Sequence, residues 1–368
     1  IDPDEDRATL RRALAAADSF EAAMDVVRRI HREQAFRVGV QVMSGTATAE
    51  AAGQAFADLA DLCIQALAPA ALSEAERLGG AFAGDVAVVA LGKCGSREMS
   101  AGSDLDLMTL YRASDPAAMS ELKGWGAETV YGRFTQRLVA ALSAPTAEGT
   151  LYEVDLKLRP SGTQGPVAVS FAAFDGYYAA EAETWELLAL TRARVVWSTS
   201  DPFAGEAAGA IEAALRRPYD RRKIARDTRE MRQLMERERP PSGFWDLKLA
   251  EGGLVDIEFA AQFLQLAHAG QGGPLIPHTA EALAALAAAG LGPAEPLRAL
   301  EGAWRLQQDL TQVIKVALSD GGDPDAEPAG FRRLLARAGG ARTWPALRAK
   351  LERARVAARA AYDIVVRA

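Results

Sequence analysis

The sequence has few of the side chains that build metal centres, disulfides or nucleophilic triads. Its 368 residues include two cysteines and three histidines. Cys63 and Cys94 show neither zinc-site spacing nor a disulfide framework, which is typical of a reducing, cytoplasmic compartment. His31, His268 and His278 are scattered singly along the chain. We therefore expect neither a zinc site nor a Ser-His-Asp triad.

Excess positive charge and long apolar runs are also lacking. The net charge is −7 and the pI is about 5.3, which disfavours nucleic acid as the main partner, because nucleic-acid binders normally carry a basic surface. No run approaches 18 consecutive apolar residues without a charge, so no membrane span is expected. The acidic start, "IDPDEDRATL", lacks Met and does not resemble a signal peptide. It suggests a cut from a longer chain.

What remains is ample material for a folded protein of two or three domains, with 49% hydrophobic and 25% charged residues. Helical spacing of apolar residues dominates both ends of the chain, whereas the middle contains short strand-like runs around one helix. We predict a helical segment over 1–80, a compact α/β domain over 81–203 and a helical bundle over 204–368. Within the α/β domain, strands are predicted over 85–92, 104–111 and 151–160, and a helix over 129–142.

The stretch "VAVVALGKCGSREMSAGSDLDLMTLY" places two aspartates in an apolar strand soon after a glycine-containing turn. Residues i and i+2 of a strand share a face, so Asp104 and Asp106 should project together. Two neighbouring carboxylates repel each other, and a magnesium ion relieves that repulsion. A DxD pattern alone is most often solvated surface, but the turn adds groups that suit a triphosphate. These predicted nucleotide-binding residues are Lys93, Gly95, Ser96 and Ser103.

A third carboxylate is expected from "LYEVDLKLRPSG", where Asp155 lies between apolar neighbours. It could serve as a metal ligand or as a general base, whereas Glu153 is interpreted as an exposed strand residue. Arg159 and Ser161 follow at the end of the strand and are predicted to bind phosphate. The alternative for Arg159 is a structural salt bridge.

Three further charged residues are weaker candidates. Arg192 and Arg194 in "TRARVV" could reach a phosphate, although nearby glutamates offer them ordinary ion pairs. Asp256 falls on the apolar arc of a predicted helix, with Phe259 and Phe263. An acid there is either paired with a buried arginine or directed into an active-site cleft.

Four motifs in order resemble the glutamine synthetase adenylyltransferase family: "LGKCGSREMSAGSDLDLMTLY", "YEVDLKLRPSG", "WELLALTRARVV" and "GGLVDIEFAAQFLQL". The first two are also similar to the wider nucleotidyltransferase superfamily. The resemblance implies an α+β fold, in which a polymerase-beta-like nucleotidyltransferase domain with a small mixed sheet is flanked by helical segments and a C-terminal helical bundle. Cys94 stands where the family usually has Leu, and Ser96 where it usually has Gly; neither departure puts activity in doubt.

Enzymes of this family have two similar halves, and "SDLDL" with "YEVD…LRPSG" resembles the carboxy-terminal, adenylylating half. The resemblance implies transfer of AMP from ATP to a tyrosine of glutamine synthetase, release of pyrophosphate, and regulation of nitrogen assimilation. It implies Mg²⁺ held by Asp104, Asp106 and Asp155, and a PII-type signalling protein and glutamine as regulators. It implies neither nucleic acid nor membrane as a partner.

Three alternatives stay open at this point. The phosphorolytic half has the same fold and metal and would release ADP from adenylylated glutamine synthetase. A uridylyltransferase for a small signalling protein would prefer UTP to ATP. A non-catalytic module would only sense nucleotide, although a purely binding fold has no need of three clustered acids.

Overall fold

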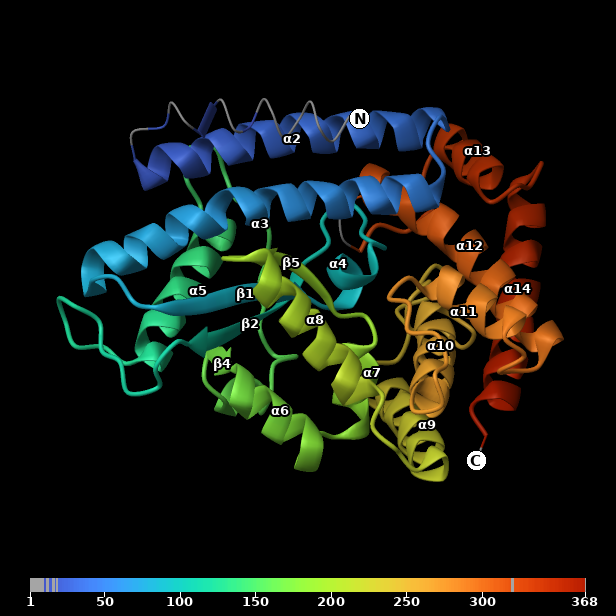
Figure 1. Ribbon diagram of the computed structural model, residues 1–368. Helices are drawn as coiled ribbons and strands as arrows, with labels where there is room; N and C mark the ends of the chain where they lie inside the picture. The colour runs from blue at the N-terminus through green and yellow to red at the C-terminus, as the bar shows by residue number, and fades with distance from the viewer. Residues whose placement is uncertain (1–9, 11–12, 15–16, 18, 319–320, 368) are drawn as a thin grey trace. The chain divides into compact units, whose positions relative to one another are not determined.

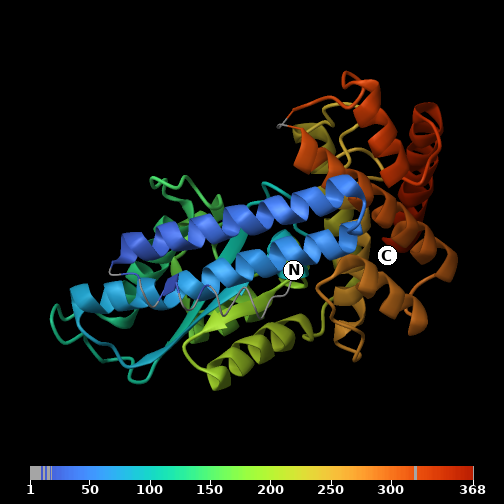
Figure 2. The same cartoon turned by 90° about the horizontal axis from the view of Figure 1, so that it is seen from above.

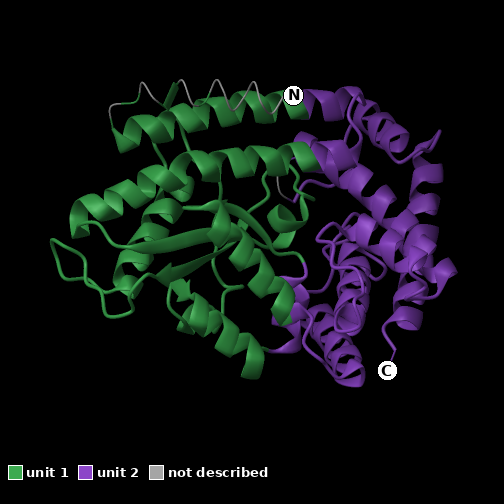
Figure 3. Ribbon diagram, in the orientation of Figure 1, with its two compact units in different colours: residues 1–38, 54–182, 192–214 green, residues 39–53, 183–191, 215–368 purple. Residues whose placement is uncertain are grey.

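The computed structural model describes residues 10, 13–14, 17, 19–318 and 321–367, and the acidic first nine residues lie outside this part. Two compact units are present, coloured separately in Figure 3. Unit 1 comprises 1–38, 54–182 and 192–214, and unit 2 comprises 39–53, 183–191 and 215–368. The mixture of a small sheet with many helices confirms the predicted α+β class.

Unit 1 is built on a five-stranded mixed sheet in the order β3-β2-β1-β5, with β4 also paired to β2 (Figure 1). The long strands β1 and β2 are antiparallel. Their paired residues run from Gly84 opposite Ala113 to Ala90 opposite Leu107. Both β3 and β4 run parallel to β2, whereas β5 is antiparallel to β1. The strands are β1 (Gly84–Ala90), β2 (Leu105–Ala113), β3 (Val154–Asp155), β4 (Ala168–Ser170) and β5 (Arg194–Ser198).

The helices of unit 1 are amphipathic or apolar and cover the sheet. Helices α2 and α3 run side by side in both views (Figures 1 and 2). Helix α5 packs against β2, β3 and β4 through buried residues such as Phe134 and Leu138. The helices that lie wholly or mostly in unit 1 are α2 (Phe20–Ser44), α3 (Ala49–Gly79), α4 (Gly92–Ser96), α5 (Ala127–Ser143), α6 (Phe171–Ala180) and α8 (Asp201–Leu215), with a short 3-10 turn, η1 (Gly162–Gln164).

Unit 2 is helical, and its most buried helix is α10 (Leu254–Ala269), which contacts α7, α9, α11, α12 and α14. Its core contains Phe263, Leu310 and Leu351, all fully buried. The other helices are α7 (Thr184–Leu190), α9 (Arg221–Glu238), α11 (Thr279–Ala288), α12 (Ala294–Ala317), α13 (Ala329–Ala338) and α14 (Trp344–Val365).

One described helix, α3, is long and apolar enough to cross a membrane by length and composition alone, although no span was expected from the sequence. More than half of its apolar window, 56%, is buried inside the protein. Core helices of folded proteins meet the same criterion. The packing of Phe56, Ile64 and Leu67 in the core of unit 1 accounts for the apolar character of α3.

Candidate functional site

The turn after β1 lies directly against Asp106. The backbone N–H of Leu91 donates to the carbonyl oxygen of Asp106 at 2.9 Å. Gly92 has a φ of +53°, and a Cβ added there would lie 1.9 Å from Asp106 Oδ2. Only glycine fits this position, because any side chain would displace the carboxylate. The sequence pattern singles out Gly95 of this turn and not Gly92. The one sequence signal available for Gly92 is that it begins a "GK" pair after a strand.

Strand pairing, rather than alternation along one strand, brings two of the predicted carboxylates together. In the parallel ladder of β2 and β3, Asp106 is the direct partner of Asp155. Direct partners on neighbouring strands lie roughly 4.8 Å apart and project from the same face. Asp104, predicted inside the strand, precedes β2 and is exposed. Because β2 begins at Leu105, Asp104 lies one residue before the strand. That Asp104 and Asp106 project together stays a prediction.

Asp155 is held in its ionised form by its own neighbour. Its carboxylate accepts the backbone N–H of Lys157 at 2.7 Å and the Lys157 ammonium at 3.0 Å. Burial raises the pKa of Asp155, but these contacts with Lys157 outweigh it, so the pKa is lowered overall. A carboxyl with a low pKa is a poor proton acceptor and a good cation ligand. Of the two roles that the sequence left open, this geometry favours the ligand.

Arg159 and Ser161 belong to the loop that follows β3. The guanidinium of Arg159 is buried and donates to the carbonyl oxygens of Leu156, Gly165 and Pro166 at 2.7, 3.0 and 2.8 Å. These three hydrogen bonds close the loop. Arg159 therefore has a structural role, and its partners are carbonyl oxygens rather than the carboxylate of a salt bridge. Ser161 is exposed and has a φ of 60°, a left-handed conformation that is uncommon outside glycine. Phosphate binding by either residue stays a prediction.

The other predicted residues of the turn differ in burial. Lys93 is half-buried, whereas Ser96 is only 1% exposed and accepts a hydrogen bond from Arg192 at 2.6 Å. The same nitrogen of Arg192 donates to Glu98, 2.5 Å away. A Cβ on Gly95 would lie 2.0 Å from the carbonyl oxygen of Arg192, so Gly95 permits close backbone packing. The buried contact between Arg192 and Ser96 therefore stabilises the turn from its interior side.

Ser103 is held in this segment by a hydrogen bond, and Cys94 is buried in it. The Ser103 hydroxyl accepts the backbone N–H of Ser100 at 3.0 Å, which ties the loop that leads to Asp104. Burial raises the pKa of the Cys94 thiol to about 12, so the residue behaves as a small apolar side chain. The described cysteines, Cys63 and Cys94, are both free and buried.

Arg194 forms a second, half-buried clamp on the same turn. It binds Asp61 of α3 through two nitrogens, at 2.7 and 2.9 Å. It also donates to the carbonyl oxygens of Cys94 and Gly95, at 3.0 and 3.2 Å. Sequence reasoning misses both Asp61 and Glu98, because nothing local in their segments marks them as partners of residues 133 and 94 positions away.

Asp256 lies in unit 2 and resolves the alternative posed for it. Its side chain is fully buried and is ion-paired with Arg232 of α9 and, at 3.3 Å, with Arg359 of α14. Its second oxygen also accepts the backbone N–H of Gly252 at 2.6 Å. The partner is thus a buried arginine, and Asp256 serves the packing of the helical unit.

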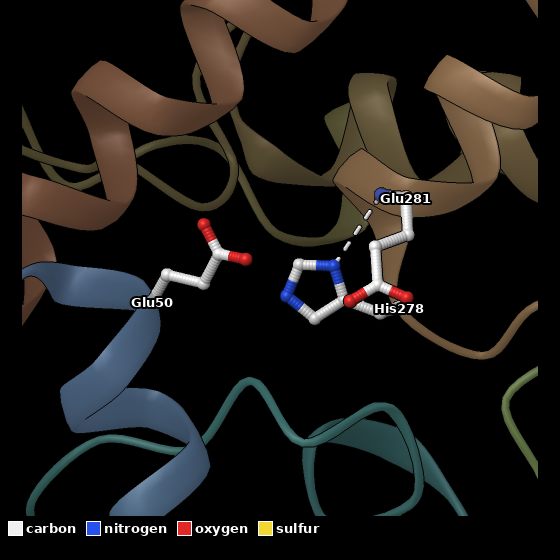
Figure 4. Close-up of side chains that lie close together, drawn as sticks. All are labelled: Glu50, His278 and Glu281. Atoms are coloured by element: carbon white, nitrogen blue, oxygen red, sulfur yellow. Dashed lines mark hydrogen bonds between the residues drawn. The ribbon is translucent and has the colours of Figure 1, made fainter.

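Among the described residues, three side chains of unit 2 have the ligand spacing of a metal site. Figure 4 shows His278 with Glu50 and Glu281, whose ligand atoms lie within 4.8 Å of one another. His278 Nδ1 accepts the backbone N–H of Glu281 at 3.4 Å and so caps the start of α11. Both glutamates also lie in first turns of helices, where the helix dipole favours acids. The capping contact brings His278 close to Glu281, and Glu50 is ion-paired with Arg305 at 3.2 Å.

Comparison with known proteins identifies the family. Residues 1–208 match the family model described as glutamate-ammonia ligase adenylyltransferase. The chain belongs to this family. Residues 222–365, the helical region of unit 2, match the family model described as GlnD PII-uridylyltransferase.

Curated relatives agree with this membership. Two of them, each called bifunctional glutamine synthetase adenylyltransferase/adenylyl-removing enzyme, come from Caulobacter vibrioides and Rhizobium meliloti. Identity is 67% and 43% respectively, over 95% of this chain in both cases. The chain covers 36% of each relative and so spans about a third of their length.

Proposed function

We propose that this chain transfers AMP from ATP to a tyrosine of glutamine synthetase and thereby regulates nitrogen assimilation. The observation that carries the proposal is the pairing of Asp106 with Asp155 beneath the Gly92–Ser96 turn, in a chain of the adenylyltransferase family. The relatives' names join two activities, adenylylation and adenylyl removal. We assign the first to this chain because of its "SDLDL" and "YEVD" motifs.

The residues present fit a divalent cation such as Mg²⁺. Asp106 and Asp155 offer carboxylates from adjacent strands, and Asp104 adds an exposed one just before β2. Because Gly92 has no Cβ, Asp106 Oδ2 can lie directly against the turn. Hard oxygen ligands and substrate phosphates are what Mg²⁺ prefers. When bound, the cation would supply charge neutralisation for the triphosphate.

The chain's own residues then bind and orient the substrates. The turn amides and Lys93 are proposed to bind the triphosphate, with Ser103, Arg159 and Ser161 at its edges. The tyrosine oxygen forms a bond to the α-phosphorus, and the bond to the bridging oxygen breaks. Pyrophosphate leaves with the electron pair, and the phenolic proton passes to solvent. Because Asp155 is held ionised by Lys157, we assign it to ligation and not to proton transfer.

The same proposal extends to the regulators of this chain and to the compartment in which it acts. We propose a PII-type signalling protein and glutamine as regulators, a view supported by the match of 222–365 to the GlnD PII-uridylyltransferase family. We also propose that the chain acts in the cytoplasm, which suits its two free, buried cysteines.

Two parallel assays test the direction of the reaction. The chain is mixed with Mg²⁺, α-labelled ATP and unmodified glutamine synthetase, and label on the synthetase is followed. In the second assay, adenylylated synthetase and phosphate replace these substrates, and ADP is measured. Label transfer without ADP release supports the proposal, whereas ADP release without label transfer would show that this is the phosphorolytic half.

A further inference from the structure

Helix α3 presents a polar stripe to the nucleotide-binding turn. Asp58, Asp61 and Gln65 are spaced three and four residues apart, so they share one face of an otherwise apolar helix. Asp58 pairs with Arg97, the residue that ends α4, at 2.5 Å. Gln65 donates to the carbonyl oxygen of Val196 in β5 at 3.1 Å. The stripe therefore contacts the turn and its supporting strand.

Asp61 is the most buried member of this stripe, at 5% exposed, and both of its carboxylate oxygens accept hydrogen bonds from Arg194. Arginine offers a planar fork of donors, and the bidentate contact with Asp61 fixes the plane of that fork. Arg194 also reaches the carbonyl oxygens of Cys94 and Gly95. Two successive peptide units of the turn are thereby held in one orientation.

This orientation matters for a triphosphate. Carbonyl oxygens at the end of a helical turn carry partial negative charge, and they would repel phosphate if they rotated toward it. While Arg194 binds the carbonyl oxygens of Cys94 and Gly95, it holds them in their present orientation. Asp61 supplies the countercharge that lets a half-buried guanidinium remain at this position.

We infer that Asp61 is a positioning residue of the nucleotide site, acting through Arg194 on the Gly92–Ser96 turn. This inference rests on the proposed function, in which that turn binds ATP. It gives α3 a part in the site that its sequence, about 30 residues before the turn, does not reveal.

The test measures the equilibrium dissociation constant for Mg-ATP in three folded proteins. Asp61→Asn should weaken binding at least tenfold, which corresponds to about 1.4 kcal/mol. The matched control is Glu74→Gln, which removes another ion-paired carboxylate from α3, the partner of Arg77. Its affinity should stay within about twofold of the original protein. A merely structural role of Asp61 would lower the melting temperature and leave affinity unchanged at a temperature where the variant is folded.

Arg194→Lys provides a second variant in case Asp61→Asn fails to fold. Lysine keeps the charge beside Asp61 but lacks the planar fork, so binding should weaken to a similar extent. Because the two residues act in series, the double variant should bind as poorly as one single variant and no worse. Unchanged affinity in both folded single variants would overturn the inference.

The same measurement separates this inference from the proposed function. If the original protein binds Mg-ATP but transfers no label, the proposed reaction fails while the dissociation constants still decide the role of Asp61. If the original protein binds no nucleotide, the inference is overturned as well.

Discussion

Gly92 and Asp106 constrain each other, because the carboxylate occupies the place that a Cβ would take. Gly92→Ala should therefore displace the Asp106 carboxylate and lower label transfer on the order of 100-fold, as expected when a catalytic group is misplaced by about 1 Å. Initial rates measured alongside thermal unfolding would separate misplacement from loss of fold.

Gly102→Ala is the matched control for this variant. Gly102 also has a positive φ, +70°, but no neighbouring atom lies within 4 Å of the position that a Cβ would take there. Both variants carry the backbone cost of a left-handed alanine, about 1 kcal/mol, whereas only Gly92→Ala crowds Asp106. Equal losses of activity in the two variants would contradict the proposed contact between the turn and the carboxylate.

At the scale of elements, α2 anchors the segment that leads into β3. His31 Nε2 lies 2.9 Å from the Tyr152 hydroxyl, and the two rings meet edge to face. Burial lowers the pKa of His31 to about 4, from an ordinary value of 6.5. The folded protein therefore resists protonating His31 between these two values, whereas the unfolded chain accepts the proton.

Stability should consequently fall as the pH drops below 6.5. Between pH 7 and pH 5 this one group should lower the free energy of unfolding by about 2 kcal/mol. In His31→Gln, which keeps a side chain able to hydrogen-bond Tyr152, that part of the loss should be missing. Urea unfolding at the two pH values measures the difference, and an identical pH dependence in both proteins would refute the assignment.

The elements also show how far the sequence predicts this fold. Strands β1 and β2 and helix α5 follow from apolar periodicity to within a few residues. The strand predicted over 151–160 is wrong in length, because the Asp155 side chain accepts the Lys157 N–H and turns the chain after two paired residues. The sequence alone does not mark β5 as a strand, since its pairing with β1 depends on residues about 100 positions away.

The sequence predicts the candidate site to about the same extent as it predicts the fold. Its acids, turn and third carboxylate are local patterns, and the chemistry of neighbouring carboxylates indicates a cation. The clamps from Asp61 and Glu98 are not predictable, because they depend on tertiary contacts of Arg194 and Arg192 that no local spacing encodes.

At the scale of the whole molecule, a buried charge cluster ties three helices of unit 2 together. Asp256→Asn would leave Arg232 and Arg359 without their shared, fully buried partner. We expect a loss of about 3–5 kcal/mol in the stability of unit 2, as is usual when one member of a buried pair is removed. The unfolding transition followed by Trp fluorescence in urea measures it.

Asp363→Asn is the control, because Asp363 pairs with the same Arg359 at 3.5 Å but has a side chain that is 54% exposed. This variant should lose less than about 1 kcal/mol. A similar loss in both variants, or a tenfold change in ATP affinity in folded Asp256→Asn, would contradict the purely structural role of Asp256.

We expect the carboxylate pair beneath the turn to be required for AMP transfer to glutamine synthetase. Label transfer from α-labelled ATP should be compared in the original protein, in Asp106→Asn and in Asp115→Asn, a loop aspartate that is exposed. We predict a loss of roughly 100- to 1,000-fold in Asp106→Asn with the fold retained, and no loss in Asp115→Asn. Transfer by folded Asp106→Asn at the original rate would contradict this prediction.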